Sequence, residues 1–139
     1  MKLRKASAAD MPEINSISLK YDLDSNDMSF EQFTVAEEKG KIIGFGRLLP
    51  HAGCVELGTI GVVEEHRRKG VAKKIIGMLI ETAKETGYKN IYLTTLIPSY
   101  FKRFGFKTLE EAPPDCMIRK KEWCEGYTKV GCTVMKLDI

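Results

Sequence analysis

The sequence lacks any apolar run long enough to cross a membrane, and its basic start, Met1–Lys5, is not followed by the apolar core of a signal peptide. We therefore expect a cytoplasmic protein with no membrane partner. The chain also lacks a strong charge of one sign, because 22 basic and 19 acidic residues leave a net charge of +3. Aromatic residues make up only 9% of it and do not interleave with a basic stripe, so nucleic-acid binding is not expected.

Cysteines are few, and their spacing argues against a structural metal site. The last three of the four, Cys116, Cys124 and Cys132, follow a C-x7-C-x7-C pattern. Structural zinc sites usually place a pair of ligands two to four residues apart, so we predict no metal. We interpret these three residues as small, partly buried thiols, with a metal or redox role as the alternative. Nothing in the spacing indicates disulfides.

The pattern of apolar residues predicts an α/β fold. At 139 residues, 43% of them hydrophobic, the chain is long enough for one domain with its own core, and we assign residues 1–139 to it. Periodicity, glycine turns and caps predict a mixed, mostly antiparallel sheet whose one parallel pair is joined by a helix. Strands are predicted over 3–5, 34–37, 42–49, 54–63, 91–94, 106–109 and 132–138, and helices over about 11–21, 71–86 and 99–104, with a short helix near 30–33.

Two details of this prediction concern proline and glycine. Pro50 is expected to end the strand over 42–49. Gly77 lies inside the helix over 71–86, where glycine costs about 1 kcal/mol relative to alanine. We expect Gly77 to be offset by a close approach of the helix to the sheet.

The segment that precedes this helix predicts an anion site built from backbone. A strand ends near Val63, basic residues follow at 67–69, and Gly70 comes directly before the helix. The first amides of a helix have no partner within it, and the helix dipole adds roughly half a positive charge at that end. Arg67, Lys73 and Lys74 bring further positive charge. A phosphorylated ligand is the natural occupant.

Three features together resemble the GNAT family of acetyl-CoA-dependent N-acetyltransferases. They are the motif Arg67-x-x-Gly70-x-Ala72, the glutamate Glu56 on the preceding strand, and an aromatic segment over 100–106 that ends Gly-Phe. The resemblance implies acetyl-CoA as cofactor, with loop amides on its pyrophosphate and strand amides and carbonyls on its pantetheine arm. The implied cofactor-binding residues are Ile60, Gly61, Val62, Arg67, Arg68, Lys69, Gly70, Val71, Ala72, Lys73, Phe101 and Arg103.

The resemblance also implies catalytic roles. Glu56 would be the general base that takes a proton from the acceptor amine, and the alternative is a structural salt bridge at the strand start. The amide of Ile60, where the family's strand bulges, would stabilise negative charge on the thioester oxygen. The family's acid tyrosine has no direct counterpart, because Phe101 stands at that position. Tyr100, one residue earlier, is the candidate acid, and a partly buried aromatic is the alternative.

A looser similarity, which extends into the C-terminal third, connects the chain with the acetyltransferase domain of N-acetylglutamate synthases. It implies a small amino acid as acceptor, glutamate first, in a variant without the amino-acid kinase domain of longer synthases. Arg47 and Glu56 are the expected substrate-binding residues, with Lys102 and Arg103 as further cationic candidates. The alternatives are acetylation of a protein or peptide amine or of a polyamine, and a non-catalytic acyl-CoA sensor. A homodimer is the oligomer to consider.

Overall fold

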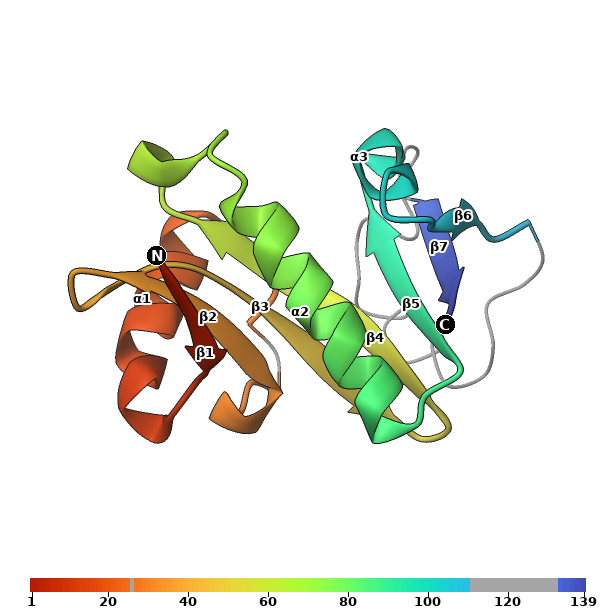
Figure 1. The fold of residues 1–139 in the computed structure, drawn as a ribbon, viewed down its shortest axis with the longest axis horizontal. Helices are drawn as coiled ribbons and strands as arrows, with labels where there is room; N and C mark the ends of the chain where they lie inside the picture. Colours follow the sequence, from red (N-terminus) through yellow and green to blue (C-terminus); the bar gives the residue numbers. More distant parts are fainter. Residues whose placement is uncertain (26, 111–132) are drawn as a thin grey trace. The chain divides into compact units, whose positions relative to one another are not determined.

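The computed structural model describes residues 1–25, 27–110 and 133–139. These residues form a seven-stranded sheet in the order β1-β2-β3-β4-β5-β7-β6 (Figure 1). Strands β4 and β5 pair in parallel at Glu56 and Tyr92, whereas β1 with β2, β2 with β3, and β7 with both β5 and β6 pair antiparallel. The prediction of an α/β fold with a mixed sheet and one parallel pair is therefore confirmed.

The elements have the following bounds. The strands are β1 (Lys2–Lys5), β2 (Phe33–Glu38), β3 (Lys41–His51), β4 (Cys54–Val62), β5 (Asn90–Thr95), β6 (Lys107–Thr108) and β7 (Thr133–Asp138). The α-helices are α1 (Met11–Lys20), α2 (Val71–Thr86) and α3 (Pro98–Lys102), and the short 3-10 turns are η1 (Ala8–Asp10), η2 (Phe30–Gln32) and η3 (Glu64–His66). None of the helices in the described part of the chain is long and apolar enough to cross a membrane.

The chain divides into two compact units, and each is described by itself. The first comprises Met1–Leu48 and Leu57–Thr82, and the second comprises Leu49–Glu56 and Ala83–Ile139. The assignment of the whole chain to a single domain stays a prediction.

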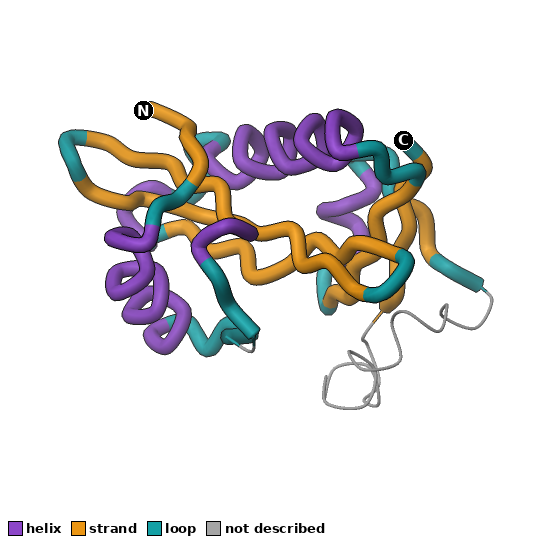
Figure 2. The backbone as a smooth tube through the Cα atoms, turned by 90° about the horizontal axis from the view of Figure 1, so that it is seen from below, coloured by secondary structure: helices purple, strands orange, loops and turns teal. Residues whose placement is uncertain are grey.

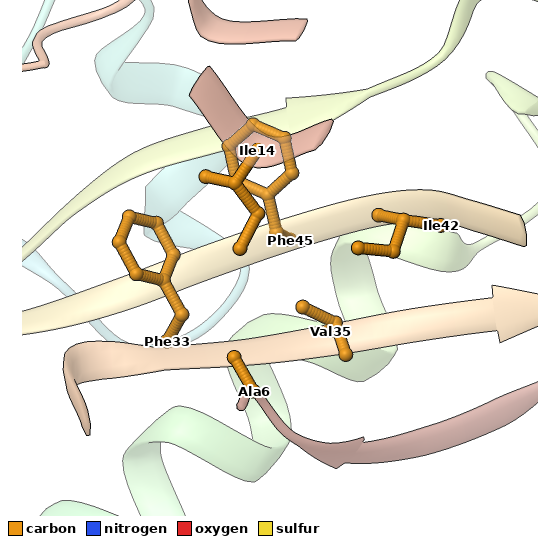
Figure 3. Packing of buried hydrophobic residues seen from close by; sticks show 6 residues of the cluster. All are labelled: Ala6, Ile14, Phe33, Val35, Ile42 and Phe45. Atoms are coloured by element: carbon orange, nitrogen blue, oxygen red, sulfur yellow. The ribbon is translucent and has the colours of Figure 1, made fainter. Parts of the chain in front are cut away.

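In the first unit, α1 and α2 lie on opposite faces of β2 and β3 (Figures 1 and 2). On the α1 face, apolar side chains from α1, β2 and β3, together with Ala6 after β1, form one cluster. Phe33 and Phe45 meet edge to face with ring centroids 5.8 Å apart, and Ile14 of α1 is fully buried among them (Figure 3). Burying each such side chain typically contributes about 1.5–3 kcal/mol. The cluster consists of Ala6, Ile14, Phe33, Val35, Ile42 and Phe45.

On the other face, α2 comes close to the backbone of β3 at two glycines. A Cβ added at Gly44 would lie 2.9 Å from Val71 Cγ1, and one at Gly46 would lie 3.0 Å from side-chain atoms of Ile75 and Leu79. These contacts are shorter than carbon atoms tolerate, so only glycine fits beneath the helix without a shift. The apolar stripe predicted for this helix is buried there, as Val71, Ile75 and Leu79 show.

Gly77 does not have the role predicted for it. A Cβ at this position would meet nothing within 4 Å, so the helix does not approach the sheet there and the prediction is wrong. The close approach that Gly77 was expected to permit is made instead by the strand glycines.

In the second unit, β5 and β7 pair along their whole lengths, from Asn90 opposite Asp138 to Thr95 opposite Thr133. Buried side chains of β5, β7 and the segment around α3 form its core. Phe101 and Phe106 meet edge to face at 6.1 Å between centroids. The buried residues include Ile91, Leu93, Phe101, Phe106 and Met135.

The observed elements depart from the sequence prediction at a few ends. Pro50 does not end its strand, because β3 continues to His51. Pro50 is exposed, and its fixed φ suits extended backbone. The short helix predicted near 30–33 is a single 3-10 turn, after which Phe33 begins β2. The predictions for the three spaced cysteines, Cys116, Cys124 and Cys132, fall outside the described residues.

Candidate active site

The loop between β4 and α2 has the backbone of an anion site. Two residues adopt positive φ, Arg68 at 64° and Gly70 at 80°. The first hydrogen bond of the helix runs from the Lys74 N–H to the Gly70 carbonyl at 3.2 Å, so the amides at 71–73 point out of the helix end. A Cβ at Gly70 would meet nothing within 4 Å, and glycine is therefore favoured here for its conformation rather than for space.

The basic side chains of this loop do not all lie at the helix end. Arg68, Lys69 and Lys73 are exposed, as a solvent-facing anion site requires. Arg67 instead turns back, because its Nε donates to the Val62 carbonyl at 2.9 Å and its guanidinium lies over the ring of Tyr21. The side chain of Arg67 thus links the loop to Tyr21 at the end of α1 and to Val62 at the end of β4.

These features fit a phosphorylated cofactor. Outward-pointing amides at a helix N-terminus, curled by two positive φ angles and surrounded by exposed cations, are the donors that a pyrophosphate needs. Backbone amides, rather than side chains, would make most of the contacts with such a cofactor. The motif therefore needs small residues at fixed positions, namely Gly70 and Ala72.

Strand β4 is distorted immediately before Ile60. Thr59 has a φ of 46°, in the left-handed region, and this is the conformation found at the first residue of one class of β-bulge. A β-branched residue strongly disfavours this region, and such strain typically costs 1–3 kcal/mol. Gly61 lies under Leu23 and Phe45, since an added Cβ would come within 2.9 Å of both side chains. The left-handed residue therefore lies directly before Ile60, whose amide is the predicted contact of the thioester oxygen.

Arg47 is buried beside Thr59, with only 1% of the residue exposed. Its Nε donates to the Thr59 hydroxyl at 2.9 Å, and one terminal nitrogen donates to Gln32 Oε1 at 3.0 Å. The other terminal nitrogen lies 3.6 Å from the Asp24 carboxylate. The carboxylate-binding role of Arg47 stays a prediction, and the contacts describe a guanidinium that holds three parts of the protein together.

Glu56 is buried in β4, and its carboxylate has a partner that the sequence analysis missed. Glu56 is 2% exposed, and its Oε1 lies 2.9 Å from Nε2 of His51 at the end of β3. A two-residue turn, Ala52–Gly53, separates the two strands. The sequence contained a signal for this contact, because a histidine and a glutamate lie on either side of a short turn between two strands. The carboxylate of Glu56, the candidate base, is therefore within hydrogen-bond distance of a histidine ring nitrogen.

Cys54 precedes Glu56 by two residues on the same strand. It is buried and disulfide-bonded, which the cysteine spacing did not indicate. Among the described residues, no group of three or more histidine, cysteine or acidic side chains is arranged to hold a metal ion.

In the aromatic segment around α3, the adjacent residues Tyr100 and Phe101 have different surroundings. Phe101 is buried against Phe106, whereas Tyr100 is half-buried and packs edge-on against Phe101 and Phe104. The guanidinium of Arg103 lies 4.7 Å from the centroid of the Tyr100 ring. Phe101 is thus a core residue, and Tyr100 with Arg103 forms the accessible pair of this segment.

The described contacts arrange the candidate residues in two groups. Arg47, Thr59 and the loop over 67–73 belong to the first compact unit, and Glu56, His51, Tyr100 and Arg103 belong to the second. Strand β4 carries both Glu56 and Ile60.

The fold joins a parallel strand pair, β4 and β5, by the helix α2, and the loop before α2 carries the positive φ angles of Arg68 and Gly70. The model of the acetyltransferase (GNAT) family matches residues 2–106, and the chain belongs to that family. It is accordingly an N-acetyltransferase that uses acetyl-CoA.

Several proteins resemble the chain over most of its length. An amino-acid acetyltransferase of Mycobacterium tuberculosis is 26% identical over 139 residues, which covers 90% of this chain and 78% of that protein. A crystal structure from the same organism, in complex with CoA, has a TM-score of 0.84 at 22% identity and covers 100% of this chain and 99% of its own. N-acetylglutamate synthase of Neisseria gonorrhoeae gives a TM-score of 0.81 at 17% identity, over 99% of this chain but 34% of that one.

Proposed function

We propose that the acceptor is the α-amino group of a small amino acid, with glutamate as the first candidate, and that the acetyl group passes to it directly within a ternary complex. The observation that carries this proposal is the similarity to the amino-acid acetyltransferase of Mycobacterium tuberculosis over 90% of this chain. A cationic side chain such as Arg103, which lies over the ring of Tyr100, suits an acceptor that bears carboxylates.

In this proposal the backbone holds the cofactor. The amides of residues 68–72 bind its pyrophosphate at the start of α2, and the β4 backbone at Ile60–Val62 binds its pantetheine arm. Bound acetyl-CoA supplies the acetyl group as an activated thioester.

Glu56 takes the proton that the acceptor ammonium must lose before its nitrogen can attack. The support is its burial on β4 and the 2.9 Å contact with His51. A positioned base of this kind typically contributes roughly 10²–10⁴-fold to the rate. His51 orients the carboxylate and offers the proton a further acceptor on the way out.

The Ile60 amide donates a hydrogen bond to the thioester oxygen, where negative charge develops during transfer. Its support is the left-handed backbone of Thr59, directly before Ile60. Tyr100 donates a proton to the departing thiolate. Its half-buried position beside Phe101, in the aromatic segment that the resemblance connects with this role, supports the assignment.

A thiol-release assay across a panel of amines tests the acceptor. We expect glutamate to give a higher kcat/KM than an N-terminal peptide amine, a lysine side chain in a peptide, or spermidine. Glutarate, which has both carboxylates and no amine, is the matched control, and we expect it to inhibit without releasing thiol.

Mass spectrometry of the product should show one added acetyl group on the amino nitrogen of glutamate. A faster reaction with the peptide or with spermidine would contradict the proposed acceptor, while the acetyltransferase activity itself would stand.

A further inference from the structure

Thr59 combines two properties that rarely occur together, a β-branched side chain and a left-handed backbone. Its φ is 46° in the middle of β4, and it is 9% exposed. The carbon substituents on its Cβ crowd the backbone in this region, so the conformation persists only where the surroundings hold it. Glycine or asparagine would adopt it more readily.

A buried polar network holds Thr59 in this conformation. The Thr59 hydroxyl accepts a hydrogen bond from Arg47 Nε at 2.9 Å and donates one to the Asp24 carbonyl at 2.7 Å. Both capacities of a hydroxyl are thereby used with short bonds. Valine has the shape of threonine but could make neither bond.

The same guanidinium fixes the segment that lies against Thr59 and Gly61. Arg47 also contacts Gln32 and the Asp24 carboxylate, and Gln32 Nε2 donates to the Asp27 carbonyl at 3.1 Å. Leu23 packs on Gly61, two residues after Thr59. Arg47 therefore ties the segment between α1 and β2 to the distorted part of β4.

We propose that Thr59 and Arg47 are positioning residues for the acyl donor. The Arg47–Thr59–Asp24 network keeps Thr59 in the left-handed conformation that presents the Ile60 N–H to the thioester oxygen of bound acetyl-CoA. The inference rests on the proposed role of the Ile60 amide and is independent of which amine accepts the acetyl group. Because Arg47 is fully buried and Thr59 is strained, the network stabilises a shape of the strand that the strand would not adopt by itself.

Cofactor binding without any acceptor tests this proposal. The probes are acetyl-CoA and S-ethyl-CoA, a thioether of nearly the same size that lacks the carbonyl oxygen. We expect the wild-type protein to bind acetyl-CoA about three- to tenfold more tightly in calorimetry, the factor that one hydrogen bond typically contributes. Because no amine is present, an error in the proposed acceptor would not alter the result.

Three variants then assign the preference to the network. Thr59→Val should reduce the preference to less than about twofold and leave the Kd for S-ethyl-CoA unchanged. Thr59→Ser retains the hydroxyl and should keep the preference. Thr59→Ala lacks both the hydroxyl and the branched Cβ but is still strained at positive φ, so it keeps the test available if Thr59→Val does not fold, and it should also lose the preference.

Two outcomes would overturn the proposal. One is a wild-type protein that binds both probes equally. The other is a Thr59→Ala or Thr59→Val variant that keeps the full preference, or that loses affinity for both probes by the same factor, as a general loss of structure would cause.

Discussion

The guanidinium of Arg67 lies 4.4 Å from the centroid of the Tyr21 ring, and the Tyr21 hydroxyl accepts a hydrogen bond from the Glu64 N–H at 3.1 Å. Tyr21 is the C-cap of α1, whereas Arg67 and Glu64 belong to the loop before α2. The anion loop is therefore held at two points by a residue far from it in the sequence.

Replacing Tyr21 should weaken cofactor binding through this brace. Tyr21→Leu removes both contacts, and we expect the Kd for CoA to rise about three- to tenfold, because an exposed cation–π contact contributes about 0.5–1 kcal/mol and the hydrogen bond a similar amount. Tyr21→Phe keeps the ring beneath Arg67 and should raise the Kd less than Tyr21→Leu. Calorimetric titration with CoA measures both variants, and equal Kd values for Tyr21→Leu and the wild type would contradict the brace.

Alanine at Gly77 should stabilise the protein. The position is helical and has open space around it, so Gly77→Ala gains about 0.5–1 kcal/mol of helix propensity without a clash. Gly46→Ala is the opposite case, since its Cβ would press on Ile75 and Leu79, and overpacking typically costs about 1–3 kcal/mol. Urea unfolding of the two variants should give shifts of opposite sign. A lower free energy of unfolding for Gly77→Ala would show that the helix is closer to its surroundings than the structure indicates.

Loss of the Glu56 carboxylate should slow acetyl transfer most at low pH. We expect Glu56→Gln to lower kcat roughly 10²–10⁴-fold near neutral pH, the usual contribution of a general base. The deficit should shrink as pH rises, because the acceptor amine then loses its proton to solvent. Glu65→Gln, at an exposed carboxylate in η3, is the control. A deficit that is the same at every pH would remove Glu56 as the base.

Asp10 should stabilise the fold except in acid. Hydrogen bonds from the Arg4 guanidinium, at 2.8 and 2.9 Å, hold the pKa of the Asp10 carboxyl below its usual range. A carboxyl with a lowered pKa in the folded state contributes fully above the pKa of the unfolded chain, near 3.8, and loses that contribution as pH falls further.

Asp10→Asn should therefore lower the free energy of unfolding by about 1 kcal/mol at neutral pH, a modest value because the pair is partly solvated. Below about pH 4 the variant and the wild type should converge. Denaturant titrations at a series of pH values measure this difference. Asp22→Asn is the control, since Asp22 is exposed and asparagine also adopts its φ of 54°. A constant difference down to strongly acidic pH would contradict the role of the carboxylate charge.

Local sequence signals were sufficient for most of the fold and for the cofactor loop. Alternation, helical periodicity and glycine turns are properties of neighbouring residues, and the structure confirms the mixed sheet that they predict. The loop could be predicted because Gly70 precedes an amphipathic helix, and its positive φ is the property for which glycine is needed there.

The errors and omissions concern contacts between residues distant in sequence. Gly77 and Gly46 look alike in the sequence, and only the packing of α2 on β3 distinguishes open space from close approach. Likewise, no local pattern indicates that Arg47 donates to Thr59. The His51–Glu56 pair could have been predicted from the sequence, because only a short turn separates the two strands.

A cofactor cradle made of peptide N–H groups has a further consequence at the level of the whole enzyme. Peptide amides neither gain nor lose protons between about pH 5 and pH 8, where histidine is the only ordinary side chain to change its charge. The loop at Gly70 should consequently hold the pyrophosphate with the same donors throughout this range. Acidity would then regulate the acceptance of the amine, while the protein stays loaded with its acetyl donor.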